Sequence, residues 1–160
     1  MKYPWIAAIA GTALMSGWYL QNVTQAQQTP SAASQGSKWP AQLDAMAAAP
    51  NSHRVLLEND RVRVLEVVVR PGEREPVHTH SWPSLMFVTH PAKLRYFPAV
   101  MIGREVQVGA GELSQAGPKP TGTPVPRWLS PEGPHAVENL DSTEFRAIRV
   151  EIKPAGERRE

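Results

Sequence analysis

Residues 72–80 read GEREPVHTH and end in two histidines, His78 and His80, which are separated only by Thr79. In an extended strand, residues two positions apart point to the same face, so the two imidazoles would lie side by side. Two imidazoles on one face of a strand form a natural half of a site for a divalent metal. A solvated strand edge is the ordinary alternative for such a pair, so the surrounding sequence has to decide between the two interpretations.

The chain around this segment is predicted to consist of short strands separated by turn residues. The predicted strands are 55–57, 61–69, 77–80, 85–89, 94–97, 105–108, 126–129, 135–139 and 145–152. In the last of them Ile148, Val150 and Ile152 alternate with Arg149 and Glu151, which is typical of a half-buried strand. Many short strands without an intervening helix predict an all-β sandwich or barrel.

Two segments of the chain resemble the two sequence motifs of the cupin family. The first motif is a glycine, five residues and His-x-His, followed three or four residues later by a glutamate. The second is Pro-x-Gly, a short gap, a histidine, three residues and an asparagine. The matching residues are Gly72, His78, His80, Pro131, Gly133, His135 and Asn139. One residue rather than two separates Gly133 from His135. The resemblance implies a small RmlC-like jelly-roll barrel over residues 51–153.

The same resemblance implies a divalent metal held by His78, His80 and His135. The glutamate of the family would fall at position 84 or 85, where this chain has Ser84 and Leu85, so a carboxylate ligand is missing from that place. Three neutral imidazoles still suit a transition metal such as Fe, Zn, Cu or Ni and leave positions open for water or substrate.

Cupin-like thiol dioxygenases have three-histidine sites, so the resemblance implies oxygenase chemistry on a small molecule, ahead of isomerase or hydrolase chemistry. The alternative is a non-catalytic barrel that binds a small ligand or has lost its metal. The retained histidines favour the first interpretation, and the missing glutamate favours the second.

Other residues are weaker candidates for the site. Arg127, on the strand that leads into the second motif, is a candidate for binding an anionic substrate bidentately. A position on the outer face is the equal alternative, because Trp128 has the opposite parity and would fill a core. Tyr96 is a candidate to hydrogen-bond a bound oxygen species. We expect His90 in a solvated turn and assign no role to His53.

The acidic residues give no clear catalytic pair. Glu58, Asp60, Glu66, Glu73 and Glu75 fall on turns or strand edges, where solvated charge is the ordinary explanation. The sequence contains no nucleophile elbow, P-loop, dinucleotide fingerprint or H-E-x-x-H pattern. The catalytic residues therefore stay unknown at this level.

The first 26 residues have the plan of a secretory signal peptide. Lys2 provides a positive start, residues 5–20 are mainly apolar, and Thr24 and Ala26 are the small residues before a predicted cleavage after Ala26. The apolar stretch is shorter than the roughly 20 residues that comfortably span a bilayer, although an uncleaved anchor is the alternative. The folded part is predicted to be periplasmic or secreted, without membrane contact after cleavage.

The composition fits one packed domain behind a linker. Of the 160 residues 41% are hydrophobic and 20% are charged, and residues 27–50 are predicted to be a flexible linker that ends in a short helix at 40–49. A polar tail is predicted at 154–160. The absence of cysteine excludes disulfides, thiolate ligands and a cysteine nucleophile.

The net charge of +2, without a basic run, gives no electrostatic case for nucleic acid. We expect a small-molecule ligand or substrate as the partner. A homodimer agrees with the family resemblance, but no sequence feature identifies an interface.

Overall fold

The structure is a computed structural model that describes residues 38–114, 117 and 119–155. The predicted signal peptide at 1–26 and its cleavage after Ala26 lie outside these residues, as do residues 27–37 of the linker and residues 156–160 of the tail. Within the described residues, no helix has the length and apolar character needed to cross a membrane.

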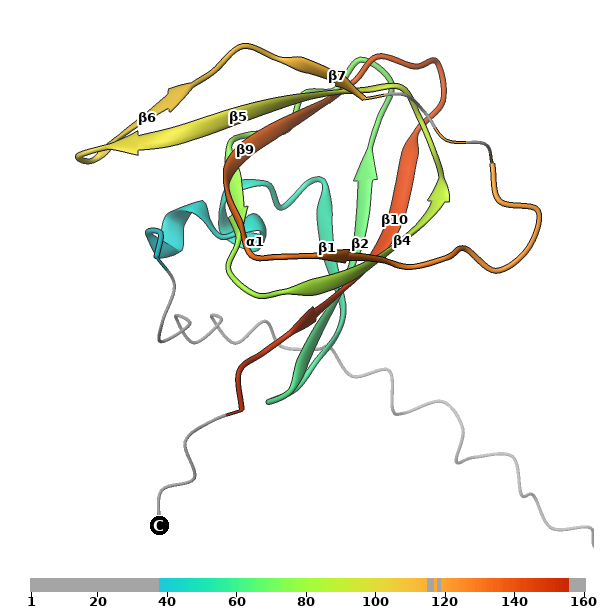
Figure 1. Cartoon of the computed structure of the whole chain (residues 1–160), viewed down its shortest axis with the longest axis horizontal. Helices are drawn as coiled ribbons and strands as arrows, with labels where there is room; N and C mark the ends of the chain where they lie inside the picture. The colour runs from blue at the N-terminus through green and yellow to red at the C-terminus, as the bar shows by residue number, and fades with distance from the viewer. Residues whose placement is uncertain (1–37, 115–116, 118, 156–160) are drawn as a thin grey trace, which may run out of the picture. The chain divides into compact units, whose positions relative to one another are not determined.

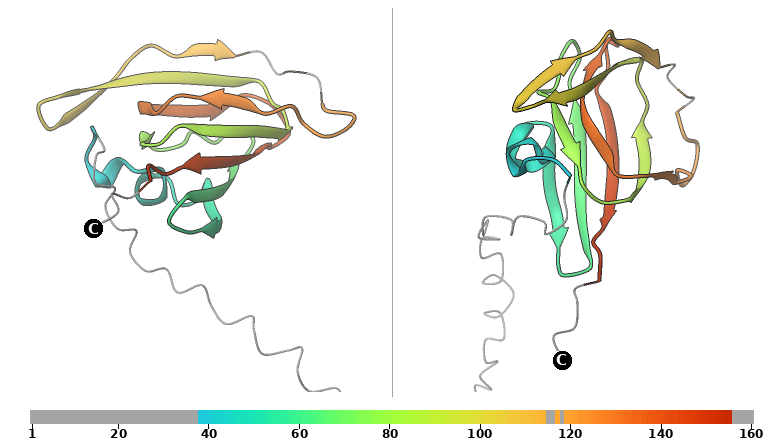
Figure 2. Two further views of the ribbon diagram at one scale, coloured as in Figure 1. Left: turned by 60° about the horizontal axis from the view of Figure 1, so that its bottom comes forward. Right: turned by 60° about the vertical axis from the view of Figure 1, so that its left-hand side comes forward.

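Two antiparallel β-sheets form the domain (Figure 1). The first has the strand order β1 (His53–Glu58), β2 (Val62–Val69), β10 (Phe145–Ile152), β4 (Ser84–His90) and β8 (Arg127–Leu129). The second has the order β3 (His78–His80), β9 (Glu132–Asn139), β5 (Leu94–Ile102) and β6 (Glu105–Val108), and β7 (Glu112–Ser114) also pairs with β5. Figure 2 shows the sheets from two further sides. The predicted all-β jelly-roll barrel is therefore confirmed.

Strand β5 differs from its prediction, because it continues to Ile102 instead of ending at residue 97. Pro98 suggested an end, since proline cannot donate a hydrogen bond to a neighbouring strand. In the structure the carbonyl of Pro98 accepts from the amide of Gly109. The pairing with β9 ends at Pro98, and the pairing with β6 begins at Ala99. The sequence analysis also missed β7, which is only three residues long.

The predicted short helix is present but is divided at Asp44. A 3-10 turn, Ala41–Leu43, precedes Asp44 and the helix α1, Ala45–Ala48, follows it. The Asp44 carboxylate accepts from the amide of Met46 at 3.1 Å and so caps α1. Thr79 of β3 donates to the carbonyl of Leu43 at 3.0 Å, so this segment is attached to the edge strand of the second sheet.

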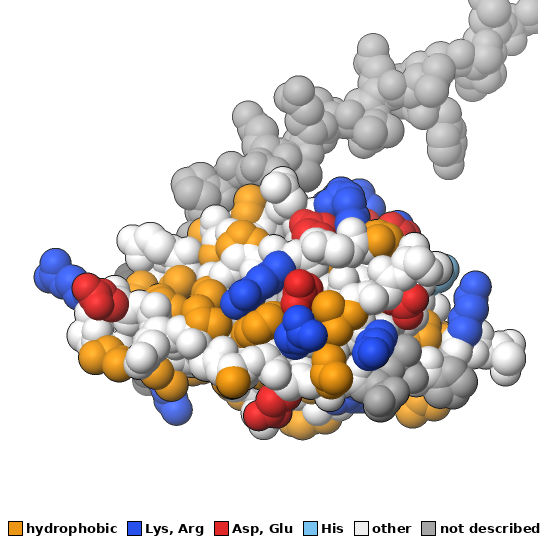
Figure 3. Space-filling model, turned by 90° about the horizontal axis from the view of Figure 1, so that it is seen from above, with side chains coloured by type: hydrophobic (Ala, Val, Ile, Leu, Met, Phe, Trp, Pro, Cys, Tyr) orange, Lys and Arg blue, Asp and Glu red, His pale blue; other side chains and the backbone are white. Residues whose placement is uncertain are grey.

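The barrel interior has an apolar end and a polar end along the same two strands. Alternate residues of β2 and β10 are buried, as expected for strands with one face in a core. On β10, however, the charged Arg149 and Glu151 belong to the buried set, whereas the apolar residues that alternate with them are only half-buried. The apolar end is built from Leu65, Val67, Val69, Ala92, Phe145 and Ala147. The polar end contains Arg63, Arg149 and Glu151, which are also buried. The surface seen from above carries hydrophobic side chains interspersed with charged ones (Figure 3).

Two residues of the sequence motifs have structural roles at the apolar end. Gly72 has a φ of +71°, a conformation that favours glycine, and its amide donates to the carbonyl of Asn139 at 3.0 Å. The buried Asn139 side chain donates to the carbonyls of Val69 and Thr143 and accepts from the amide of Asp141. Asn139 therefore ties β9 to the end of β2 and to the turn before β10.

We expect Asn139→Ala to lower the free energy of unfolding by about 2–3 kcal/mol, because it leaves two carbonyls and an amide without their partner. Urea denaturation followed by tryptophan fluorescence measures this change. The nearby exposed Ser142→Ala is the matched control and should stay within about 0.5 kcal/mol of the parent. Equal effects of the two substitutions would contradict the role of Asn139.

Candidate metal centre

Four histidines meet at the polar end of the barrel. His53 begins β1, His78 and His80 lie on β3, and His135 lies on β9 opposite His78. All four are buried, with exposed fractions between 1% and 4%. The ring centres of His78 lie 4.7, 5.2 and 4.4 Å from those of His53, His80 and His135. The ring centre of His80 is 5.3 Å from that of His53 and 5.8 Å from that of His135.

Each of these rings uses its Nδ1 atom to contact an oxygen. The partners are the carbonyls of Ala49 (3.2 Å, to His53), Pro76 (2.9 Å, to His78) and Gly133 (2.8 Å, to His135), and the carboxylate of Glu151 (2.7 Å, to His80). A carbonyl oxygen only accepts, so the proton of the first three rings resides on Nδ1. Their Nε2 atoms therefore carry a free lone pair, which is the form that binds a metal.

The fourth ring is oriented by a chain of buried charges. Glu151 accepts from Nε of Arg63 at 2.5 Å, and Arg63 donates through both terminal nitrogens to Asp44 at 2.9 Å. Burial opposes the charge of Arg63, but the hydrogen bonds with Asp44 and the charge of Glu151 outweigh it and raise its pKa. Burial raises the pKa of Glu151, while the charge and hydrogen bond of Arg63 act in the opposite direction. The donation from Arg63 favours an ionised Glu151, and we therefore assign the proton between Glu151 and His80 to Nδ1 of His80.

Burial keeps the four imidazoles neutral. Desolvation lowers the pKa of His53 to about 4 and also lowers the pKa values of His78, His80 and His135. The charge of Arg149 contributes to the lowering for all four rings. Neutral imidazole is the protonation state that a metal requires.

The ligand atoms form two overlapping groups. Donor atoms of His53, His78 and His80 lie within 4.8 Å of one another, and so do those of His80, Glu132 and His135. The predicted set of His78, His80 and His135 is also brought together, with ring centres 4.4–5.8 Å apart. Its role as a ligand set stays a prediction.

The distances between the ring centres are close to those expected for imidazoles around a metal. With a metal–nitrogen distance near 2.1 Å, rings at octahedral to tetrahedral angles have centres roughly 4.5–5.2 Å apart. The observed distances of 4.4–5.8 Å fall close to that range. The group of His53, His78 and His80 and the group of His80, Glu132 and His135 therefore fit a divalent metal by the spacing of their donor atoms.

The sequence analysis missed His53, Glu132 and the burial of Glu75. Glu132 is the variable residue of Pro-x-Gly, and it brings a carboxylate to the cluster although positions 84 and 85 provide none. Glu75 is only 4% exposed instead of solvated, and its Oε1 atom lies 3.6 Å from Nδ1 of His53. Burial and the neighbouring charge of Glu73 raise the pKa of Glu75 to about 8.

The remaining predicted residues have different environments. Arg127 is exposed and pairs across β8 and β4 with Met86, whose side chain packs on the core, so it shares the inner-face parity. Its role in substrate binding stays a prediction. Trp128 has the opposite parity but is 60% exposed, so the expectation that it fills a core is wrong. Tyr96 stacks on His135 with ring centres 5.1 Å apart, and His90 is exposed as expected.

Trp82 is buried, with the guanidinium of Arg63 4.8 Å from its ring centre. This contact places Trp82 against the chain of charges that orients His80, as part of the polar end of the core.

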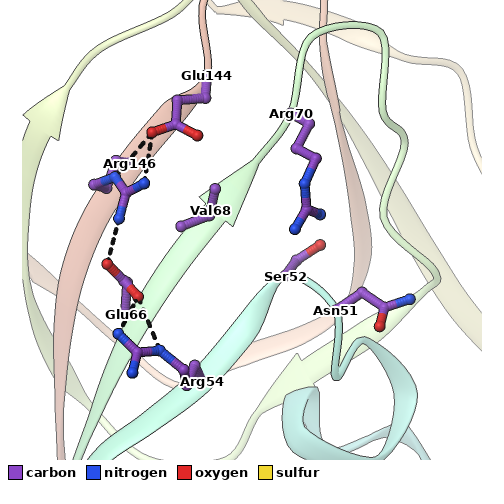
Figure 4. A pocket seen from close by; sticks show the side chains of 8 residues that line it. All are labelled: Asn51, Ser52, Arg54, Glu66, Val68, Arg70, Glu144 and Arg146. Atoms are coloured by element: carbon purple, nitrogen blue, oxygen red, sulfur yellow. Dashed lines mark hydrogen bonds and ion pairs between the residues drawn. The ribbon is translucent and has the colours of Figure 1, made fainter.

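A surface hollow lies on the other face of the first sheet (Figure 4). Its lining includes Arg54, Glu66, Arg146 and Glu144, which are joined by ion pairs in that order. Glu66 alternates with the buried Leu65 along β2 and therefore points away from the interior. This row of paired charges is separate from the histidine cluster.

No protein-family model matches the chain, and no curated protein matches its sequence. Several solved structures are similar to it. A cupin domain from Bordetella pertussis Tohama I is 22% identical, with 64% of this chain and 92% of that chain covered and a TM-score of 0.46. An RmlC-like cupin family protein with a double-stranded β-helix fold from Methanocaldococcus jannaschii is 11% identical, with coverages of 63% and 78% and a TM-score of 0.43.

The polyketide cyclase RemF from Streptomyces resistomycificus is also similar, at 20% identity, coverages of 62% and 63% and a TM-score of 0.39. These similarities are low. The description of the metal centre therefore rests on the residues of this chain.

The four buried rings should all be in the Nδ1–H tautomer in protein treated with a chelator. The oxygen partners at each Nδ1 atom impose this state. Long-range proton–nitrogen NMR correlations of imidazoles at pH 7 measure it, and a His90→Ala variant assigns the fifth ring. An Nε2–H tautomer at two or more of the buried rings would contradict the arrangement described above.

Proposed function

We propose that this chain is an exported metalloprotein whose buried histidines hold one divalent transition metal for oxygenase chemistry on a small molecule. The observation that carries the proposal is the set of four neutral imidazoles, each with Nδ1 engaged by an oxygen and Nε2 left for a metal. Nitrogen donors favour Fe, Cu, Ni or Zn over metals that prefer oxygen.

The proposed ligands are His78, His80 and His135, and His53 and Glu132 are alternative ligands, because each belongs to a three-residue group that includes His80. Two histidines and one carboxylate, as in the group of His80, Glu132 and His135, form the ligand type of non-haem iron oxygenases. A bound metal would supply open coordination positions at which oxygen and a substrate become reactive. The protein holds the rings in their metal-binding tautomer, and its buried setting excludes bulk water.

A second candidate function is a barrel that holds a metal or small ligand without turnover. It is favoured by the deep burial of the cluster, because the exposed fraction of each histidine is 4% or less. The two functions share the metal centre and differ in whether oxygen is consumed.

The full chain, expressed with export and purified from the exported compartment without chelator, should contain close to one equivalent of metal. Elemental mass spectrometry measures the content. The double variant His78→Ala, His80→Ala should lose the metal because it removes two adjacent ligands, whereas the exposed His90→Ala control should keep it. A metal-free parent that takes up no Fe, Zn, Cu or Ni on soaking would overturn the proposed centre.

Oxygen consumption by the metal-loaded chain, tested against a panel of small organic acids and alcohols with the double variant as blank, separates the two functions. Oxygen uptake that the double variant lacks supports the oxygenase. A loaded centre that consumes no oxygen with any of these compounds supports the binding function.

The proposed export can be tested separately. N-terminal sequencing of the purified protein should begin at Gln27, because the predicted cleavage follows Ala26. An intact Met1 on protein recovered from the membrane fraction would instead identify an uncleaved anchor.

A further inference from the structure

Arg149 is a buried cation with unpartnered donors beside the histidine cluster. It faces the interior from β10 and is only 3% exposed. Its Nη1 atom forms an ion pair with Glu132 at 2.6 Å. Its Nε and Nη2 atoms have no hydrogen-bond partner among the described residues, and the nearest oxygen of Glu151 is 3.9 Å from Nε. Buried donors of this kind are rare and costly unless a ligand or water completes them.

The two unpartnered donors lie on the same edge of the guanidinium. Nε–H and one hydrogen of Nη2 point in parallel, and this edge matches the two oxygens of a carboxylate in a bidentate pair. The other buried arginine is already used, because Arg63 donates through all three nitrogens to Asp44 and Glu151. One free guanidinium edge matches one carboxylate, whereas a phosphate dianion would demand more positive charge.

A second unpartnered group lies on the same inner face. Ser84 is fully buried, and its hydroxyl has no partner among the residues that the structure describes. Ser84 pairs with Glu151 across β4 and β10, and Met86 pairs with Arg149, so Ser84 and Arg149 occupy neighbouring inward positions. A hydroxyl at this place can donate to a bound carboxylate or to a neighbouring polar group of the ligand.

The free edge of the Arg149 guanidinium lies close to the proposed metal site. Glu132, which pairs with Arg149, also belongs to the ligand group of His80 and His135. A carboxylate on the free edge of Arg149 would thus lie beside the histidine cluster.

We infer that Arg149 binds the carboxylate of a small organic acid next to the histidine cluster. The inference deepens the proposed function and rests on it for the role of that acid as substrate, but binding of the carboxylate itself does not need the metal. It also assigns to Arg149 the anion-binding role that the sequence analysis gave to Arg127.

Propionate is the probe, and the neutral propionamide of nearly the same shape is its control. Proton–nitrogen NMR of the chelator-treated full chain follows the Nε–H of Arg149 during each titration. We expect a saturable shift with propionate and none with propionamide. No response to propionate would overturn the inference, and because metal content is measured separately, this failure is distinct from failure of the metal centre.

Two variants locate the binding residue. Arg149→Lys keeps the charge but loses the bidentate edge, so propionate affinity, followed for both variants by the backbone amide signals, should fall by about tenfold or more. Arg127→Gln is the matched control and should leave the affinity within about twofold. Loss of binding in Arg127→Gln with retention in Arg149→Lys would overturn the assignment. If circular dichroism shows that Arg149→Lys does not fold, the titration of the Arg149 Nε–H in the parent protein tests the inference by itself.

Discussion

The polar end of the barrel depends on the position of Glu151. Its carboxylate is fully buried and binds Arg63 with one oxygen and His80 with the other. Removing one partner from a buried charged pair typically costs about 3–5 kcal/mol, because the remaining charge has no compensation. Arg63 extends the contact to Asp44, which precedes α1. The carboxylate of Glu151 on β10 is therefore connected to β2, to the segment before α1 and to a histidine of the cluster.

The apolar core and the polar residues beside the histidine cluster lie at opposite ends of the same two strands, β2 and β10. On β2 and β10 the buried positions change from Val69 and Phe145 at one end to Arg63 and Glu151 at the other. Burial of apolar area stabilises the fold without directional requirements. Charged groups and imidazoles need oriented partners, and the rigid apolar end supplies the frame that holds them.

Local patterning predicted most of the strands and placed His78 and His80 on one face, and the resemblance of two motifs to the cupin family implied that His135 lies with them. Neither revealed His53, Glu132 or the burial of Glu75. His53 reaches the cluster because the chain folds back through α1, and the contact between β1 and β3 segments has no signature in either segment. Irregular pairing of β3 with β9 accompanies the approach of Glu132, and a register shift of this kind is set by tertiary packing.

The oxygen atoms that accept from the four rings are of two kinds, and a substitution can remove only one kind. Those of His53, His78 and His135 are main-chain carbonyls, which any residue at positions 49, 76 and 133 would provide. Only the acceptor of His80 is a side chain. Point substitutions during evolution can therefore alter the basicity of one imidazole through position 151, while the other three stay fixed until the backbone itself is rebuilt.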